Sequence, residues 1–156
     1  MAKKILVAID DSENAMRAVE FVANTFTTDN QVTLFNVVQD TATLCEMNSP
    51  ELTPYFTSQQ SSFCLLEEKK KELVTQALQK SKSILIDGGF EEKNVTIKAE
   101  LKKKGVARDI IKEAQSGYNI IVMGKRGVSG IKDFLLGSIS QKVFSLAKDN
   151  SVLFVN

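Results

Sequence analysis

The 156-residue chain contains no histidine. Imidazole is the usual general base at neutral pH and a common zinc ligand, so its absence excludes Ser–His and Cys–His catalysis and His-ligated zinc. Glycine and proline are scarce, with eight and two residues, which excludes collagen-like and low-complexity chains. The formal net charge is only +1, from 20 basic and 19 acidic residues, whereas a nucleic-acid-binding protein shows a basic excess. We therefore expect no nucleic-acid partner.

A long apolar run is also missing near the start of the chain. Lys3 and Lys4 precede an apolar run of only five residues, Ile5–Ile9. A secretory signal needs about 7–15 apolar residues and a membrane span needs about 20. We expect neither, and we expect a cytoplasmic protein without a membrane partner.

Cysteine is nearly absent as well. The two cysteines, Cys45 and Cys64, are 19 positions apart, without CxxC spacing and without other soft ligands nearby. They can form one bridge, but free thiols are the expectation for a chain without an export signal. No dedicated metal site is expected.

What the chain does contain is an alternation of five strand-like and four helix-like runs. The strand-like runs, rich in Val, Ile, Leu and Phe, are Lys4–Ile9, Gln31–Val38, Val95–Leu101, Asn119–Met123 and Ser151–Val155. The first, fourth and fifth are almost continuously apolar, which is typical of buried parallel strands, while the third alternates and suits a sheet edge. Apolar residues at helical spacing predict helices near Ala15–Phe26, Ser62–Ile86, Ala107–Ala114 and Ile139–Ala147.

This alternation predicts one α/β domain over residues 1–156, with a parallel sheet covered by helices on both faces. The segment Gln39–Ser62 interrupts the pattern, because it contains both prolines, Pro50 and Pro54, and many Ser, Thr and Gln residues. A loop of this length inside a domain is usually a lid, an interface element or disordered. The sequence leaves an ordered and a mobile segment equally open.

The most informative stretch is MGKRGVSGIKDFLLGSIS, residues Met123–Ser140. A buried strand ends at Gly124, a loop contains Gly127 and Gly130, and Gly137–Ser138 begins the last helix. Glycine lets backbone N–H groups approach a ligand, and a helix N-terminus offers unpaired N–H donors that favour phosphate. The stretch therefore predicts phosphate binding. In the alternative interpretation the serine is only an N-cap and the glycines are only turn residues.

Two acidic residues, Asp10 and Asp11, follow the first strand. If the first and fourth strands are neighbours, Asp10 faces the glycine loop across the crevice where open α/β sheets bind ligands. An aspartate beside phosphates must contact ribose hydroxyls or a divalent ion, so ribose is its expected partner and Mg²⁺ the alternative. The other interpretation is that both acids cap the first helix, with Ser12 as a further candidate cap; for Asp11 capping is the expected role. A receiver domain is not expected, since Glu100–Gly105 (ELKKKG), directly after the third strand, contains no aspartate and no lysine follows the fifth strand.

These residues resemble the universal stress protein family. Its nucleotide motif, G-x2-G-x9-G-[ST], is met by Gly124, Gly127, Gly137 and Ser138. Asp10, the LFNVV strand, the KKGVARDII helix start and the short last strand are also similar to that family. The resemblance covers nearly the whole chain apart from Gln39–Ser62.

The resemblance implies a Rossmann-like three-layer sandwich with a five-stranded sheet in the order 3-2-1-4-5. It also implies a dimer that binds ATP, or ADP or AMP, with Mg²⁺ held through the phosphates and Asp10 as a further candidate ligand. Adenine would lie against the backbone at Ala8 and Val37, ribose near Asp10, and phosphates against the amides of Arg126–Gly130 and Ser138–Ser140. The expected nucleotide-binding residues are Ala8, Asp10, Val37, Met123, Gly124, Lys125, Arg126, Gly127, Val128, Ser129, Gly130, Gly137, Ser138, Ile139 and Ser140.

The leading hypothesis is a cytoplasmic ATP-binding module that changes its affinity for an unidentified protein partner with nucleotide state. The apolar last strand, Ser151–Val155, lies at a sheet edge in the implied order and predicts a homodimer through that edge. The alternatives are a slow ATPase and a nucleotide-free structural or chaperone-like protein. Efficient hydrolysis is not expected, because only Asp10, Asp11 and Asp133 are candidate bases near the site.

Overall fold

The computed structural model describes residues 1–45, 54–125 and 136–156, with the backbone alone at 43–44. Its centre is a parallel five-stranded sheet in the order β3-β2-β1-β4-β5, which confirms the expected order. The strands are β1 (Lys4–Ala8), β2 (Gln31–Val38), β3 (Val95–Leu101), β4 (Ile120–Gly124) and β5 (Ser151–Val155). The helices are α1 (Glu13–Thr25), α2 (Ala42–Cys45), α3 (Pro54–Asp87), α4 (Val106–Ala114) and α5 (Ser138–Leu146), with a single 3₁₀ turn at Glu92–Asn94.

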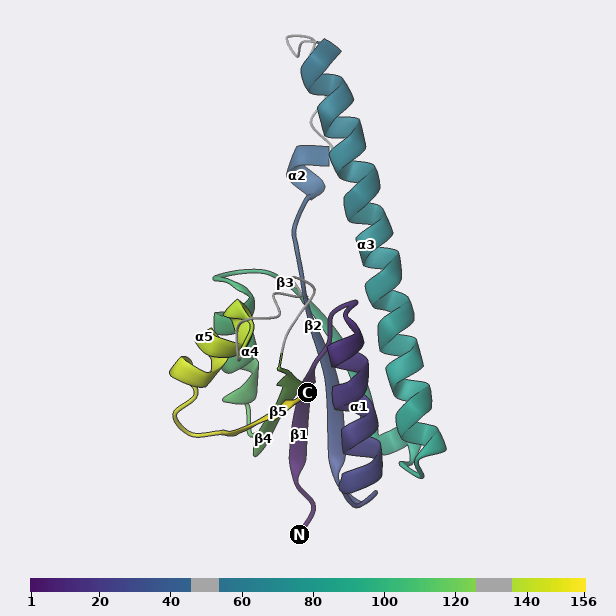
Figure 1. Cartoon of the computed structure of the whole chain (residues 1–156), viewed down its shortest axis with the longest axis vertical. Helices are drawn as coiled ribbons and strands as arrows, with labels where there is room; N and C mark the ends of the chain where they lie inside the picture. The colour runs from purple at the N-terminus through teal and green to yellow at the C-terminus, as the bar shows by residue number, and fades with distance from the viewer. Residues whose placement is uncertain (46–53, 126–135) are drawn as a thin grey trace.

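Helices cover both faces of the sheet, α1 and α3 on one side and α4 and α5 on the other (Figure 1). Alternate residues of each strand supply the two cores, because successive side chains of a strand point to opposite faces. Ile5 and Val7 pack towards α1 and α3, whereas Leu6 and Phe35 pack towards α4 and α5. Because all neighbouring strands pair in parallel, their carboxyl ends lie at one edge of the sheet.

Strand positions and sheet edges follow the sequence closely. β2, β3 and β5 have the expected bounds, and β3, with its alternating pattern, is an edge strand as predicted. β5 is the other edge. The predicted adjacency of the first and fourth strands is confirmed by the pairing of Leu6 with Ile121 and of Val7 with Val122.

The N-cap of α1 is Ser12, whose hydroxyl accepts a hydrogen bond from the backbone N–H of Ala15 at 3.2 Å. Asp11, expected to cap this helix, is exposed and precedes the cap, so that expectation was wrong. The smaller serine hydroxyl reaches the first-turn N–H from the residue that adjoins the helix directly.

The segment expected as a long loop, Gln39–Ser62, is partly helical. It contains α2, and α3 begins at Pro54 rather than near Ser62. Proline is tolerated in the first turn of a helix, where its missing N–H has no intrahelical partner in any residue. Only the C-terminal half of α3 carries buried residues, Leu78, Ser81 and Leu85, and its N-terminal half extends beyond the sheet (Figure 1). The other proline, at position 50, lies outside the described residues.

Cys45 and Cys64 form a disulfide, so the expectation of free thiols was wrong. The physical reason is tertiary: α2 lies beside α3, and the two Cα atoms are 5.8 Å apart, within the range that a disulfide spans. Cys45 was expected in the loop Gln39–Ser62 and Cys64 in the helix Ser62–Ile86, and neither pattern gave a sign of this proximity. The disulfide links the chain that leaves β2 to the extended half of α3.

Within the described part of the chain, no helix combines the length and the apolar character needed to cross a membrane.

Candidate functional site

A cavity of about 340 Å³ opens at the carboxyl ends of β1, β2 and β4. It lies at the point where the strand order reverses, since β1 pairs with β2 on one side and with β4 on the other. Open α/β sheets bind ligands at this place. Its lining residues are Ala8, Ile9, Asp10, Ser12, Ala15, Phe35, Asn36, Val37, Val106, Ile110, Met123, Gly124, Gly137, Ser138, Ile139 and Ser140.

One part of the cavity is an apolar slot. Phe35 and Val37 of β2 face Val106 and Ile110 of α4, and Met123 of β4 closes the slot. Phe35, Ile110 and Met123 are buried, so these side chains have fixed neighbours in the core between the sheet and α4. A cavity wall of apolar side chains with few polar groups is suited to the ring of an organic ligand.

Asp10 supplies the acidic group of the cavity. Its Oδ1 accepts hydrogen bonds from the backbone N–H of Ser12, at 2.9 Å, and from the Ser12 hydroxyl. These two bonds orient the carboxylate, and no described residue donates to its Oδ2. One oxygen of Asp10 is therefore available to a ligand hydroxyl or to a cation.

The start of α5 supplies three backbone donors. Gly137 is the N-cap without a side-chain hydrogen bond, and the first intrahelical bond runs from the Gln141 N–H to the Gly137 carbonyl at 2.9 Å. No described residue accepts a hydrogen bond from the N–H groups of 138–140. Unpaired first-turn amides at the positive end of a helix favour an anionic group. The Ser140 hydroxyl instead donates to the Gly124 carbonyl at 3.1 Å, which fixes α5 to the end of β4.

Gly124 allows β4 and α1 to pack closely against each other. A Cβ placed on it would lie 2.7 Å from the Cβ of Asn14 and 2.9 Å from the Asn14 carbonyl carbon. Carbon atoms in contact are normally about 3.5–4.0 Å apart, so only glycine lets the first turn of α1 lie this close to β4. The first glycine of the motif thus brings the Asp10–Ser12 turn next to the start of α5.

The structure brings together nine of the expected nucleotide-binding residues: Ala8, Asp10, Val37, Met123, Gly124, Gly137, Ser138, Ile139 and Ser140. It places Lys125 outside the cavity lining. The Lys125 N–H donates to the Val155 carbonyl at 2.7 Å, and the Lys125 carbonyl accepts from the Gly137 N–H at 2.9 Å. The expected phosphate-binding residues Arg126, Gly127, Val128, Ser129 and Gly130 lie outside the described residues, as do Lys132 and Asp133.

Several lining residues were missed from the sequence. Asn36 is 8% exposed, and its side-chain Nδ2 donates to the Ile9 carbonyl at 2.7 Å. A polar residue inside the apolar run LFNVV was the available signal for it. Val106 and Ile110 share one face of α4 because they are four residues apart, but nothing in their pattern separates a cavity wall from an ordinary core.

The loop that leads into α4 is fixed by Asp109. Its carboxylate accepts from the backbone N–H of Lys103 at 2.8 Å and of Lys104 at 3.1 Å. Burial alone would raise the pKa of the Asp109 carboxyl, but the backbone N–H groups of Lys103, Lys104 and Gly105 outweigh it and hold this pKa below its usual value. The charged carboxylate keeps the loop closed and holds Val106 at the cavity.

No group of three or more Cys, Asp or Glu residues that could hold a metal ion occurs among the described side chains. Among the described lining residues, only Asp10 offers a carboxylate oxygen to a cation such as Mg²⁺.

The model of the universal stress protein family matches residues 1–155 of this chain. A universal stress protein of Mycolicibacterium smegmatis is 26% identical over 144 residues, and the match covers 92% of this chain but only 45% of that protein. Universal stress protein YxiE of Bacillus subtilis is 24% identical over 149 residues, covering 94% of this chain and 95% of the relative. The chain thus spans about half the length of one relative and nearly all of the other.

Solved structures show the same fold. The structure of a protein called MJ0577 has a TM-score of 0.65 and 27% identity, covering 99% of this chain and 96% of that one. A universal stress protein in complex with cAMP has a TM-score of 0.64 and 15% identity, covering 99% and 97% of the two chains.

Proposed function

The chain belongs to the universal stress protein family, and we propose that it is a nucleotide-dependent switch that binds ATP with Mg²⁺. One observation carries the proposal: one oxygen of Asp10 and three amides at the start of α5, none of them paired with a described residue, line the same cavity. In a nucleotide, the ribose hydroxyls need an acceptor such as the Asp10 oxygen. The phosphate chain, at the other end, needs donors such as the α5 amides. The cAMP complex of a structural relative supports a nucleotide of this class.

In the proposed arrangement the adenine ring enters the apolar slot between Val37 and Ile110, beside the backbone of Ala8. The ribose hydroxyls donate to Asp10, and the phosphates accept from the amides of Ser138–Ser140. Mg²⁺ is held by the phosphates. Hydrolysis is at most slow in this proposal, because Asp10 is the only carboxylate among the described cavity-lining residues and it is assigned to the ribose.

Thermal unfolding with nucleotide tests the proposal. At a hundredfold excess over Kd, Mg·ATP adds about 2.7 kcal/mol to the free energy of unfolding, which raises Tm by about 5–10 °C for a chain of this size. ADP, AMP and cAMP are measured beside ATP to rank the natural ligand. A Tm that stays unchanged with all four nucleotides would remove nucleotide binding and leave a structural or chaperone-like role.

Two matched variants test whether the nucleotide binds in this cavity. Asp10→Asn keeps the side-chain shape but removes the charge that accepts from the ribose, so the binding free energy should weaken by about 1.5–3 kcal/mol. At the same ATP concentration, the stabilisation of about 2.7 kcal/mol should then fall to about 0.3–1.3 kcal/mol. Asp11→Asn removes the neighbouring, exposed carboxylate, which does not line the cavity, and should retain the full shift. Equal shifts for the two variants would locate the nucleotide elsewhere.

The proposed assembly is a homodimer through β5. The Ser151 N–H donates to the Asn119 carbonyl and the Val155 carbonyl accepts from Lys125, so residues 151, 153 and 155 face β4. In a parallel strand the intervening residues face the other way, so the backbone groups of Val152 and Phe154 lie on the open edge. An apolar strand with an unpaired edge is a template for a second strand.

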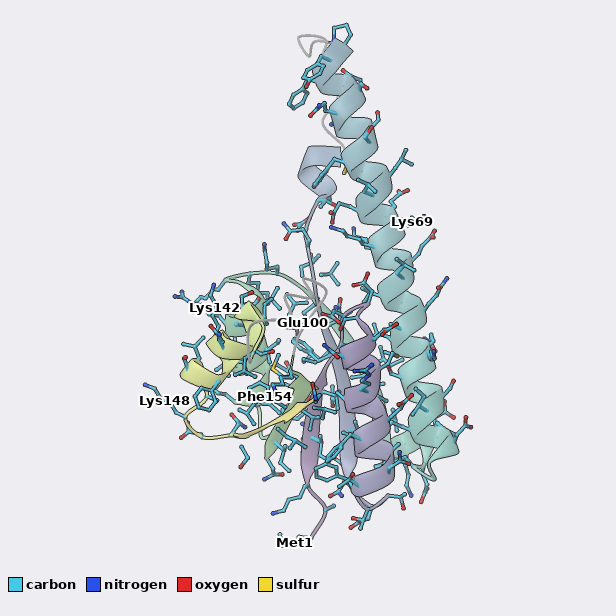
Figure 2. All side chains as sticks on the ribbon, in the orientation of Figure 1. Met1, Lys69, Glu100, Lys142, Lys148 and Phe154 are labelled. Carbon is cyan, nitrogen blue, oxygen red and sulfur yellow. A yellow bond between two sulfur atoms is a disulfide. The ribbon has the colours of Figure 1, made fainter. Side chains whose placement is uncertain are left out.

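Phe154→Pro removes the outward N–H at the middle of this edge and should convert the dimer to a monomer in sedimentation equilibrium. Phe154→Ala is the control: it loses the ring, labelled in Figure 2, but keeps the N–H and should remain dimeric. The ladder to β4 is untouched in both, since Phe154 faces away from it. A wild-type chain that sediments as a monomer at micromolar concentration would contradict the proposed dimer.

The proposed consequence of binding is a change in affinity for a protein partner, and the proposed compartment is the cytoplasm. A ligand shifts such an equilibrium only through different affinities for the two states, so partner binding and ATP binding should strengthen or weaken each other by the same factor.

A further inference from the structure

The disulfide between Cys45 and Cys64 lies outside both hydrophobic cores of the described structure. It joins α2 to the part of α3 that extends beyond the sheet (Figure 1). Among the described residues of α3, Val74 is the first that packs against a core, and it follows Cys64 by about 15 Å of helix. The bond therefore restrains a peripheral segment and takes no part in the packing of the two cores.

The segment 54–66 of α3 packs poorly against the rest of the described structure. None of its residues is buried, and Leu65 and Leu66 are 67% and 61% exposed. The segment contains no charged residue that could form an ion pair. The hydrogen bond from Gln59 Nε2 to the Tyr55 hydroxyl, at 2.9 Å, lies within the helix itself. Because helices in proteins owe most of their stability to tertiary packing, this end of α3 frays readily unless a crosslink restrains it.

The other end of the disulfide is anchored to the sheet. Cys45 lies one turn after Thr41, which is buried, and the Cys45 N–H donates to the Thr41 carbonyl at 2.9 Å. Three residues before Thr41, the Val38 carbonyl accepts from the Lys102 N–H at 2.7 Å, which fixes the end of β2 beside the end of β3. The disulfide therefore connects the segment 54–66, through a short stretch of chain, to the central sheet.

The disulfide is accessible to dissolved thiols, because both cysteines are partly exposed. A thiolate attacks one sulfur, forms a mixed disulfide with it and releases the other cysteine as a thiolate. A second thiol then displaces the first from the protein, and the two leave as their own disulfide. The two cysteines together gain two electrons and two protons, which the two reagent thiols lose. The reverse exchange closes the bond again, and the chain contains no third cysteine that could form a wrong pair.

We propose that Cys45 and Cys64 form a reversible redox switch, whose substrates are a small-molecule thiol and the corresponding disulfide. In the oxidised chain the segment 54–66 is held as a helix and presents the apolar side chains of Tyr55, Leu65 and Leu66 in fixed positions. In the reduced chain the crosslink is lost and the segment frays. The nucleotide cavity keeps its shape in both states, because neither cysteine lines it. The switch therefore operates with or without a nucleotide.

Amide hydrogen exchange of the full-length chain, read by mass spectrometry, tests the switch with glutathione as the probe. After treatment with millimolar reduced glutathione, we expect both cysteines to titrate as thiols. Exchange in residues 58–66 should then be at least tenfold faster than in the chain treated with oxidised glutathione, because the crosslink no longer limits the opened segment. Residues 78–87 should exchange equally in both states, since the buried Leu78 and Leu85 hold that part of α3. Oxidised glutathione added to the reduced chain should restore slow exchange.

Three variants separate the bond from the helix sequence. Cys64→Ser, and Cys45→Ser, which leaves α3 unaltered, should both exchange like the reduced wild type with either form of glutathione. Ser62→Ala, at an exposed position two residues before Cys64, is the matched control and should keep the response. Slow exchange of residues 58–66 in both cysteine variants would overturn the proposal. So would a bond that reduced glutathione leaves intact, or free thiols after treatment with oxidised glutathione. No measurement uses ATP, so the result is independent of nucleotide binding.

Discussion

Phe35→Ala is expected to lower the free energy of unfolding by about 4 kcal/mol, because it removes a large side chain that is 1% exposed. Phe35 lies at the centre of the core between the sheet and α4, with Leu6, Ile110 and Met123 around it. These neighbours belong to two strands and a helix, so the space cannot close by moving one side chain. The corresponding decrease in Tm is about 8–16 °C.

The measurement is urea unfolding followed by circular dichroism, with Phe144→Ala as the control. Phe144 is 63% exposed, and its ring contacts that of Phe154 at a centroid distance of 6.4 Å, so its loss should cost at most about 1 kcal/mol. Similar losses for the two variants would mean that the core around Phe35 repacks, which the fixed positions of β1, β2 and β4 argue against.

Gly124→Ala is expected to cost about 3 kcal/mol, although it adds a single methyl group. The new Cβ would lie 2.7 Å from the Asn14 Cβ and 3.0 Å from the Asn14 carbonyl oxygen. Both belong to the first turn of α1, so relief requires the helix to move away from β4. Overpacking of this kind costs about 1–3 kcal/mol or more, and the expected decrease in Tm is about 6–12 °C.

A double-mutant cycle separates this clash from other effects. Asn14→Gly removes the Cβ that the new methyl group meets, so in this background Gly124→Ala should cost at least about 1 kcal/mol less. Asn14→Ala keeps that Cβ and should give no relief. If Asn14→Ala relieves the loss as fully as Asn14→Gly, the clash with the Cβ is not its cause.

The sheet was predictable from the sequence because its strands are short, apolar and separated by clear helical patterns. The runs Gln31–Val38, Val95–Leu101 and Ser151–Val155 coincide with β2, β3 and β5. The strand order came from the resemblance to a family and not from the patterns, since apolar content alone does not say which buried strands are neighbours.

The wrong predictions concern features of the fold that depend on tertiary contacts. Proline at position 54 was read as part of a loop, yet it begins α3, because its backbone suits a first helical turn as well as a turn between strands. The pairing of Cys45 with Cys64 depends on α2 lying beside α3, which no periodicity in either segment indicates.

For the candidate site, the sequence indicated Asp10 and the start of α5, which carry charge and a recognisable motif. It did not indicate Asn36 or Val106, whose role follows only from the place where β2 and α4 meet. The sequence suggested that position 124 is glycine so that the backbone can approach a ligand. In the structure, glycine is needed there because a Cβ would lie too close to Asn14. Gly124 therefore has a packing role that the motif did not indicate.

The uneven attachment of α3 has a consequence for how this chain can be modified. Its buried residues begin at Leu78, and residues 54–62 lie beyond the sheet, in the turns before the disulfide-bonded Cys64. Seven residues inserted there would lengthen the helix by about two turns and about 10 Å, and would bring the added face back to nearly the same angle. The overhang is therefore a place where a reporter or an epitope can be grafted without altering the domain beneath it.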